Sequence, residues 1–133
     1  MIGLGVDMVQ ISQLQSQLAD DASVFAKQTF TNQEIRYSRS HASGEPARHL
    51  AARFAAKEAL IKAWSSLRVG KAPVIERSNL REIEVHNDPY GRPQIRLHGL
   101  FKEHLNNYKI QVSLSHDGDY AIATILLFSG GLP

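Results

Sequence analysis

The sequence predicts an α+β fold in which helices pack on a mainly antiparallel sheet. Three observations indicate this class. The middle of the chain is a long alanine-rich segment without interior glycine or proline, which is typical of a helix. The first residues and the last third alternate apolar and polar side chains, as strands do. Turn signals separate the strands of the last third, so these strands are expected to run antiparallel. The 133 residues are expected to form one domain, residues 1–133.

The chain opens with a predicted strand. Its side chains alternate between an apolar face (Ile2, Leu4, Val6) and a face with two glycines and an acid (Gly3, Gly5, Asp7). Glycines beside a carboxylate leave room for another backbone or a ligand to approach closely. The next segment, residues 11–25, is predicted as one weak helix, with Leu14 and Leu18 as its apolar pair.

A short helix is predicted to begin at Asn32. Thr31 and Glu34 have the spacing of a capping box, in which each side chain binds the backbone amide of the other residue. Phe30 and Ile35 occupy the two positions of a hydrophobic staple. The polar residues 38–45 that follow are expected to form a loop.

The long helix is predicted to begin near Pro46, which suits a first helical turn, and to extend to about residue 67. Leu50, Phe54 and Ile61 form its apolar stripe. Glu58 falls inside that stripe, and Lys62 follows it at the i+4 position. A carboxylate on an apolar helix face is a candidate functional group.

The last third is predicted to hold two hairpin-like units. Strands around residues 83–85 and 95–97 flank the turn sequence NDPYGRP, residues 87–93. A short helix is expected at residues 100–108. A strand through Val112 and Leu114 then leads to His116, and a turn at residues 117–119 returns the chain into an apolar strand at residues 120–128.

Composition excludes several classes of function. The chain has no cysteine, so disulfides, thiolate nucleophiles and cysteine zinc sites are excluded. A net charge of +2 gives no argument for nucleic acid as a partner. No apolar run has the length of about 20 residues that a membrane span needs, so no membrane is expected. The first residues lack the basic start of a signal peptide, and the protein is expected to be cytoplasmic.

Three polar residues stand where a plain core would be apolar: Asp7, Glu58 and His116. Two carboxylates brought together repel each other unless a cation lies between them. A divalent ion with few protein oxygens and with substrate phosphates in its shell is the magnesium pattern, and Arg53, Lys57 and Lys62 of the long helix are candidate phosphate ligands. Each residue also has a plain structural interpretation. Glu58 and Lys62 alone would form an ordinary i,i+4 pair, and a histidine at a strand end is usually a structural group.

Three segments, in order and spacing, resemble the holo-[acyl-carrier-protein] synthase family. The first is the G-x-D start at residues 5–7. The second is the (W/F)-x-x-K-E-A-x-x-K helix from Phe54 through Lys57 and Glu58 to Lys62. The third is the S-H-x-x-x-x-A-x-A strand pair that starts at Ser115 and His116. The turn at residues 87–93 also resembles the family, so the likeness covers nearly the whole chain.

The resemblance implies a phosphopantetheinyl transferase with the fold of that family. Such an enzyme moves 4′-phosphopantetheine from coenzyme A to a carrier-protein serine and releases adenosine 3′,5′-bisphosphate, for fatty acid biosynthesis. It implies that Asp7 and Glu58 hold Mg²⁺ and that Glu58, Lys62 and His116 are catalytic. The residues implied to bind coenzyme A are Arg53, Lys57, Lys62, Gly91, Arg92, Pro93, Ser115 and His116. The general base stays open between Glu58 and a water on the metal.

Small members of the family are trimers with coenzyme A between neighbouring subunits, so the resemblance also implies a homotrimer. The implied partner is an acyl carrier protein or a carrier domain of a fatty-acid synthase. In one respect the chain departs from many relatives, which carry several arginines on the first helix. Residues 10–25 here contain no Lys or Arg, and they include Asp20 and Asp21.

Two other functions remain open at this point. A magnesium-dependent hydrolase would use the same acids to cleave coenzyme A with water. A regulator would bind coenzyme A or nucleic acid through the basic residues 48–62 without catalysis, although an acid within that helix is an odd choice for holding phosphates without a metal.

Overall fold

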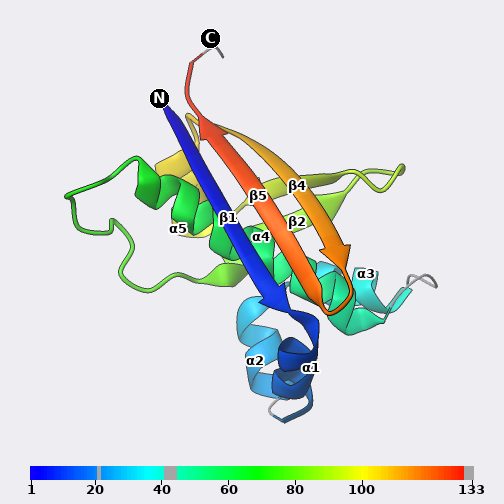
Figure 1. Ribbon diagram of the computed structural model, residues 1–133. Coiled ribbons are helices and arrows are strands. Elements are labelled where there is room, and N and C mark those ends of the chain that lie inside the picture. The colour runs from blue at the N-terminus through cyan, green and yellow to red at the C-terminus, as the bar shows by residue number, and fades with distance from the viewer. Residues whose placement is uncertain (21, 41–44, 131–133) are drawn as a thin grey trace.

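The computed structural model describes residues 1–20, 22–40 and 45–130. Strand β1 (Ile2–Gln10) is followed by four helices, then by a short 3₁₀ turn η1 (Leu80–Glu82) and four strands with one further helix between them (Figure 1). The helices are α1 (Ile11–Asp20), α2 (Ala22–Thr29), α3 (Asn32–Ser40), α4 (Pro46–Ser66) and α5 (Gly99–Leu105). The later strands are β2 (Ile83–Asn87), β3 (Pro93–Leu97), β4 (Lys109–Asp117) and β5 (Tyr120–Phe128).

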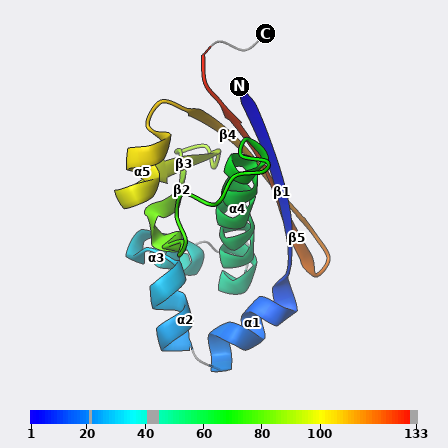
Figure 2. The ribbon, with the colours of Figure 1, turned by 90° about the vertical axis from the view of Figure 1, so that its left-hand side faces the viewer.

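The strands form two antiparallel sheets. The larger sheet has the order β1-β5-β4, and β2 and β3 form a separate hairpin. Helix α4 runs through the centre of the molecule, with the larger sheet on one side and the β2–β3 hairpin, α3 and α5 on the other (Figure 2). The predicted α+β class is confirmed, since helices pack on antiparallel strands.

The glycines of β1 allow α4 to lie directly against the sheet. A Cβ atom at Gly3 would lie 2.3 Å from the carbonyl oxygen of Ala63, and one at Gly5 would lie 2.0 Å from that of Ala59. The facing helix residues are themselves small, and Ala59 and Ala63 are fully buried. The predicted close approach of a backbone to these glycines is therefore confirmed.

The opposite face of β1 points away from the helix. Ile2, Leu4 and Val6, its apolar stripe, are 48%, 61% and 51% exposed. In this strand the glycine face, and not the apolar face, lies against the core. The reason is that α4 approaches too closely to leave room for larger side chains on the side that it covers.

Three local predictions are confirmed. The backbone amide of Thr31 donates to Glu34 Oε1 at 3.0 Å and the amide of Glu34 donates to Thr31 Oγ1 at 3.2 Å, so the capping box forms and α3 begins at Asn32. Helix α4 begins at Pro46. The turn at residues 87–93 joins β2 to β3, and Gly91 there has a φ of +82°, a conformation that favours glycine.

Other boundaries differ from the prediction. Residues 11–25 form parts of two helices and not one, with the junction at Asp21 outside the described residues. The predicted loop 38–45 begins later, because α3 continues to Ser40; residues 41–44 also lie outside the described part of the chain. Helix α5 spans residues 99–105, where 100–108 was predicted. Within the described residues, no helix is both long and apolar enough to cross a membrane.

Candidate active site

Asp7 and Lys62 form the first part of the site, where β1 passes over α4. Asp7 lies on the same face of β1 as Gly3 and Gly5, so its side chain points toward the helix. Lys62 Nζ donates to Asp7 Oδ1 at 3.0 Å and to the carbonyl oxygen of Val6 at 3.2 Å. The Asp7 side chain is 17% exposed and that of Lys62 is 57% exposed, so solvent reaches the pair.

Glu58 lies one helical turn before Lys62 and is half-buried. Burial and the negative charge of Asp7 raise the pKa of Glu58, and the nearby Lys62 opposes that rise. The charge of Asp7 thus acts on the Glu58 carboxylate. Both acids line a hollow of about 310 Å³, together with Phe54 of α4 and two glutamines of α1, Gln13 and Gln17.

These acids fit a magnesium ion in their chemistry. Two carboxylates that repel each other are stabilised by a cation between them. Within the part of the chain that the structure describes, no group of three His, Cys, Asp or Glu side chains gathers as a complete metal site. A pair of acids with free space beside it matches the magnesium pattern, in which water and substrate phosphates supply the remaining ligands.

A second hollow, of about 220 Å³, gathers four more of the predicted residues. Arg53 comes from α4, Gly91 and Pro93 from the turn between β2 and β3, and His116 from the end of β4. His116 reaches this hollow because it continues the side of β4 that holds Val112 and Leu114, which faces the core. The second hollow shares no lining residue with the first.

Arg53 has contacts on two sides in the second hollow. Its guanidinium lies 4.2 Å from the centre of the Tyr37 ring and donates a hydrogen bond to Asn87 Oδ1. Asn87 Nδ2 in turn donates to the carbonyl oxygen of Gly91 at 3.0 Å, which ties the turn to the helix. Burial lowers the pKa of Arg53, while the charges of Glu34 and Tyr37 oppose that shift.

Sequence reasoning missed several lining residues of the second hollow: Tyr37, His49 and Asn87. Asn87 belongs to the turn motif and could have been found from it. The others had no signal, because their contribution depends on how α3 packs against α4.

Three residues that were predicted to bind coenzyme A line neither of the two hollows. Lys57 is fully buried, and its Nζ lies 2.7 Å from Glu34 Oε1 and 2.8 Å from the Leu80 carbonyl oxygen. Burial lowers the pKa of Lys57, and Glu34 opposes that shift. The predicted direct contact between Lys57 and a phosphate is therefore corrected. This ammonium has two internal partners and no exposure to solvent.

Arg92 and Ser115 also lie apart from the second hollow. Arg92 is exposed, and its Nε donates to Asp88 Oδ2 at 2.8 Å within the turn. Ser115 pairs in register with Ile122, which is exposed, whereas His116 pairs with the buried Ala121. Because adjacent strand residues face opposite sides, Ser115 lies on the outer face of the sheet.

The chain matches a model of the 4′-phosphopantetheinyl transferase superfamily over residues 3–125. It is 44% identical over 131 residues to the holo-[acyl-carrier-protein] synthase of Nocardia farcinica, covering 98% of this chain and 90% of that protein. It is 46% identical over 127 residues to the synthase of the same name from Mycobacterium tuberculosis, covering 96% of each chain.

Solved structures agree with the sequence relatives. A structure described as an ACPS–CoA complex of Chronobacterium ammoniagenes matches with a TM-score of 0.88 and 41% identity, covering 98% of this chain and 99% of that one. The acyl carrier protein synthase of Mycobacterium tuberculosis matches with a TM-score of 0.79 and 43% identity, covering 96% and 97%.

A fold of helices on antiparallel strands is thus shared with solved acyl carrier protein synthases. The chain belongs to the 4′-phosphopantetheinyl transferase superfamily and, within it, to the holo-[acyl-carrier-protein] synthase family. The resemblance found in the sequence is confirmed, and with it the prediction that the chain is an enzyme.

Proposed function

We propose that this enzyme transfers 4′-phosphopantetheine from coenzyme A to a serine of an apo acyl carrier protein, or of a carrier domain in a fatty-acid synthase. The serine oxygen forms a bond to the β-phosphorus of coenzyme A, the bond from that phosphorus to the bridging oxygen breaks, and adenosine 3′,5′-bisphosphate leaves. The observation that carries the proposal is the convergence of Asp7, Glu58 and Lys62 beside an open hollow. The reaction would serve fatty acid biosynthesis in the cytoplasm.

Each charged group has a role in this proposal. Asp7 and Glu58 would hold Mg²⁺, which neutralises charge on the phosphoryl oxygens when it is bound. Lys62 is more than half exposed beside Asp7, so its ammonium is open to solvent and would bind the pyrophosphate and stabilise charge on the departing oxygen. The general base that takes the serine proton would be Glu58 or a water held by the bound metal.

Arg53 and His116 would bind the nucleotide end of coenzyme A, with Gly91 and Pro93 beside it. Arg53 is suited to a phosphate because its planar guanidinium is already oriented by Tyr37 and Asn87. We assign Lys57 an internal role. Arg92 and Ser115 would contact coenzyme A only from a neighbouring subunit or after the turn moves.

We further propose that the chain, a single domain, assembles as a homotrimer. The outer face of the large sheet supports this, because it exposes large apolar side chains from two neighbouring strands: Ile2, Leu4, Val6, Met8, Tyr120 and Ile122. In a ring of three, the acid-lined hollow of one subunit would meet the Arg53 hollow of the next, so that one coenzyme A spans both. Sedimentation should show a trimer, and Leu4→Glu should yield inactive monomers. A fully active monomer would contradict this assembly.

Mass spectrometry of an apo carrier domain tests the activity. After incubation with coenzyme A and Mg²⁺, the carrier should gain the mass of one phosphopantetheine group on its serine. A carrier with that serine changed to alanine is the control. Release of free phosphopantetheine without any carrier would favour the hydrolase, and binding of coenzyme A without either product would favour the regulator. Either result would overturn the proposal.

A further inference from the structure

Helix α1 begins without a capping residue of its own. Strand β1 ends at Gln10 and α1 begins at Ile11, so no loop separates the two elements. Neither residue at this junction belongs to the types that favour an N-cap, and the first turn of α1 contains no acid. The first amides of a helix have no partner within it, so they need acceptors from another part of the chain.

Asp119 supplies these acceptors from the turn between β4 and β5. The amide of Ile11 donates to the Asp119 carbonyl oxygen at 2.7 Å, and the amide of Ser12 donates to Asp119 Oδ1 at 3.0 Å. Ser12 Oγ donates to Asp119 Oδ2 at 2.5 Å. The hydrogen bonds from Ser12 stabilise the charged carboxylate and lower the pKa of Asp119. One residue thus holds the first turn of α1 through both its backbone and its side chain.

The turn that carries Asp119 is short. Strand β4 ends at Asp117 and β5 begins at Tyr120, so Gly118 and Asp119 alone join the two strands. Gly118 has a φ of +57°, a conformation that glycine adopts without strain. Asp117 pairs in register with Tyr120, so the ladder of the larger sheet continues up to this loop. Asp119 is therefore anchored to the larger sheet, and its hydrogen bonds connect α1 to that sheet.

Helix α1 contributes most of the exposed rim of the acid-lined hollow. Gln13 and Gln17 of α1 line the hollow, and Gln13 directly follows Ser12. In the part of the chain that the structure describes, the exposed lining residues are these two glutamines and Met8 of β1. A protein whose serine reaches the two acids must cover this rim. None of the residues proposed to bind coenzyme A lies on α1.

We propose that Asp119 is a positioning residue for the carrier protein, an inference that rests on the proposed function. By capping α1 and connecting it to the β4–β5 turn, Asp119 holds the rim at the place where the carrier serine enters the hollow. Asp119 lines neither hollow, so it acts through α1. Without its acceptors, the first turn of α1 occupies the docking position for a smaller fraction of the time. The apparent affinity for the carrier falls in proportion to that fraction.

Steady-state kinetics of Asp119→Ala test this inference, with an apo acyl carrier domain that the unmodified enzyme modifies. The KM for the carrier should rise about five- to tenfold, the size expected for the loss of one helix cap, while the KM for coenzyme A stays within about twofold. Asp117→Ala is the matched control and should change neither KM. Asp117 is an exposed acid of the same hairpin, and no hydrogen bond from its side chain to α1 is found in residues 1–20, 22–40 and 45–130.

The two KM values distinguish the possible failures. An unchanged KM for the carrier in a folded Asp119→Ala enzyme would contradict the inference and leave the proposed function intact. An equal rise in both KM values would also contradict it, because Asp119 would then support the whole site and not the carrier surface. If the unmodified enzyme transfers phosphopantetheine to no apo carrier, the proposed function and the inference are overturned together.

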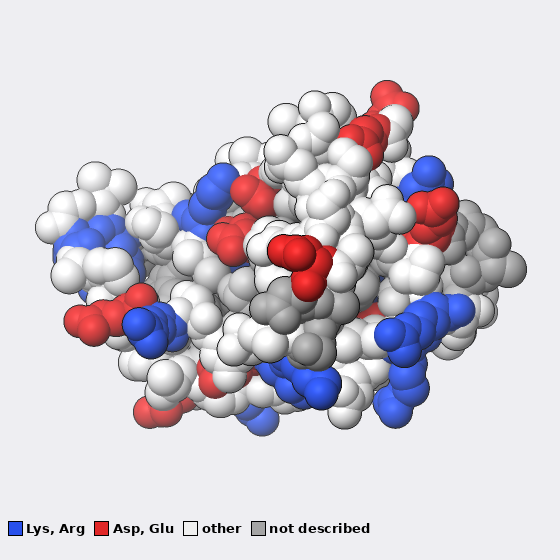
Figure 3. All heavy atoms as spheres, turned by 90° about the horizontal axis from the view of Figure 1, so that it is seen from below, with Lys and Arg blue, Asp and Glu red and all other residues white. Residues whose placement is uncertain are grey.

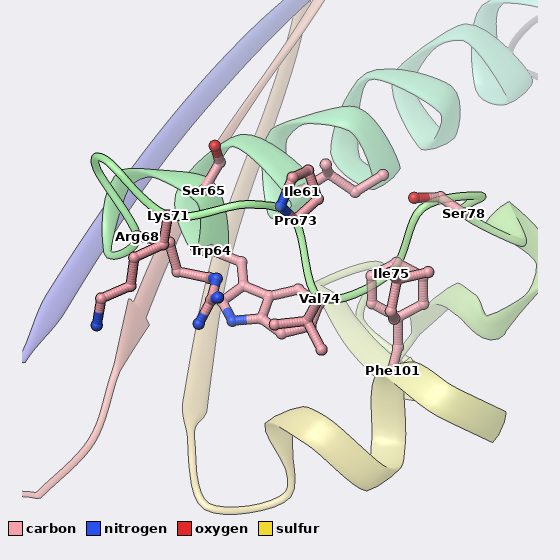
Figure 4. A pocket seen from close by; sticks show the side chains of 10 residues that line it. All are labelled: Ile61, Trp64, Ser65, Arg68, Lys71, Pro73, Val74, Ile75, Ser78 and Phe101. Carbon is pink, nitrogen blue, oxygen red and sulfur yellow. The ribbon is translucent and has the colours of Figure 1, made fainter.

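Trp64 separates a local effect on α1 from a general loosening of the fold. This residue, the only tryptophan in the chain, lines a cavity of about 120 Å³ at the C-terminal end of α4 (Figure 4). Helix α1 packs instead near Leu50, about 20 Å along α4 at a rise of about 1.5 Å per residue. Asp119→Ala should leave the Trp64 fluorescence unchanged and accelerate amide hydrogen exchange at residues 11–14. A changed fluorescence, or unchanged exchange, would contradict the local role of Asp119.

Ser12 gives a second, independent measurement. Ser12→Ala removes the hydroxyl that donates to Asp119 but keeps the backbone amide, so the KM for the carrier should rise less, by about threefold. The double variant Ser12→Ala with Asp119→Ala should have the KM of Asp119→Ala alone, because both changes remove the same hydrogen bond. If the two effects multiply, Ser12 and Asp119 act separately on the carrier, and the inference is wrong.

Discussion

Glu34 serves two purposes in this structure, and only one of them was visible in the sequence. As the capping residue of α3, its Oε1 accepts the amide of Thr31. The same oxygen accepts the buried ammonium of Lys57, and Oε2 accepts the amide of Val85 at 2.9 Å. One carboxylate thus joins α3, α4 and β2. Buried charges of this kind are tolerated only when they are paired and fully hydrogen-bonded.

Breaking this pair should cost stability. Lys57→Met removes the ammonium and leaves a buried carboxylate without its cation, so the free energy of unfolding should fall by about 3 to 5 kcal/mol. Denaturant unfolding measures the change, and Lys27→Met at the end of α2 is the control. Adding Glu34→Gln should cost less than the sum of the single changes, because the second change removes the unpaired charge. Strictly additive losses would show that the pair is not coupled.

The two acids of the active site should be needed for turnover and not for folding. Asp7→Asn and Glu58→Gln each remove a ligand charge at nearly constant volume, so kcat/KM at limiting Mg²⁺ should fall at least about a hundredfold. Circular dichroism and thermal unfolding should remain close to wild type. Glu103→Gln, at an exposed acid on α5, is the control. Wild-type turnover in either active-site variant at limiting Mg²⁺ would refute the metal assignment.

At the scale of elements, the contact between β1 and α4 determines where the site forms. Gly3 and Gly5 bring the strand against the helix backbone, and Asp7 follows on the same face. That spacing places the Asp7 carboxylate 3.0 Å from Lys62 Nζ. The helix carries Glu58 one turn earlier, so a single strand–helix contact brings the three charged groups together.

Gly5→Ala should therefore affect both stability and catalysis. The added Cβ would lie 2.0 Å from a backbone oxygen, which cannot move away as a flexible side chain would. We expect a loss of about 1 to 3 kcal/mol in the free energy of unfolding, together with a lower kcat, because the helix shifts relative to Asp7. Val24→Ala on exposed α2 should change neither quantity. A Gly5→Ala enzyme with unchanged stability would contradict the observed packing.

At the scale of the whole molecule, positive charge is dispersed. Helix α1 has no basic residue in its last turn, and residues 10–20 contain no Lys or Arg. Seen from below, the molecule shows separate basic patches with acids between them (Figure 3). A carrier protein with an acidic recognition helix would find little long-range attraction here. Asp21, the second acid of this region, lies outside the described residues.

The kinetics with a free acidic carrier should reflect this surface. We expect a high KM and a kcat/KM that falls only gently between about 0.05 and 0.5 M salt, because screening removes little attraction. Tethering the carrier, as in a multidomain synthase, should compensate through local concentration. A steep salt dependence in the unmodified enzyme would mean that other basic residues hold the carrier.

Added charge on α1 provides the matched test. Gln15→Arg combined with Asp20→Arg should lower the KM for the carrier and steepen its salt dependence, with unchanged affinity for coenzyme A. Both positions are exposed, and neither lines the acid-lined hollow. Gln15→Glu alone should raise the KM. If both charge changes have the same effect, electrostatic attraction does not govern docking.

The sequence alone determined the features that depend on a few neighbouring residues. The capping box of Thr31 and Glu34, the start of α4 at Pro46 and the turn around Gly91 all follow from local hydrogen bonds and backbone preferences. The family motifs indicated that Asp7 and Glu58 belong to one site, which their spacing in the sequence could only suggest. The predicted helix ends near Asp21 and residue 105 were less accurate, because a weak apolar periodicity does not show where a helix ends.

Only the tertiary structure decided which of the predicted groups face a ligand. Ile2, Leu4 and Val6 form a regular apolar stripe, yet they lie on the open side of β1 because α4 occupies the glycine side. Lys57 shares a motif with Glu58 but points inward, where Glu34, 23 positions away, completes its ion pair. Ser115 and His116 are adjacent in sequence and lie on opposite faces of the sheet. Each outcome depends on segments that meet only in the folded chain, so local sequence could not determine whether a side chain is buried, paired or open to a ligand.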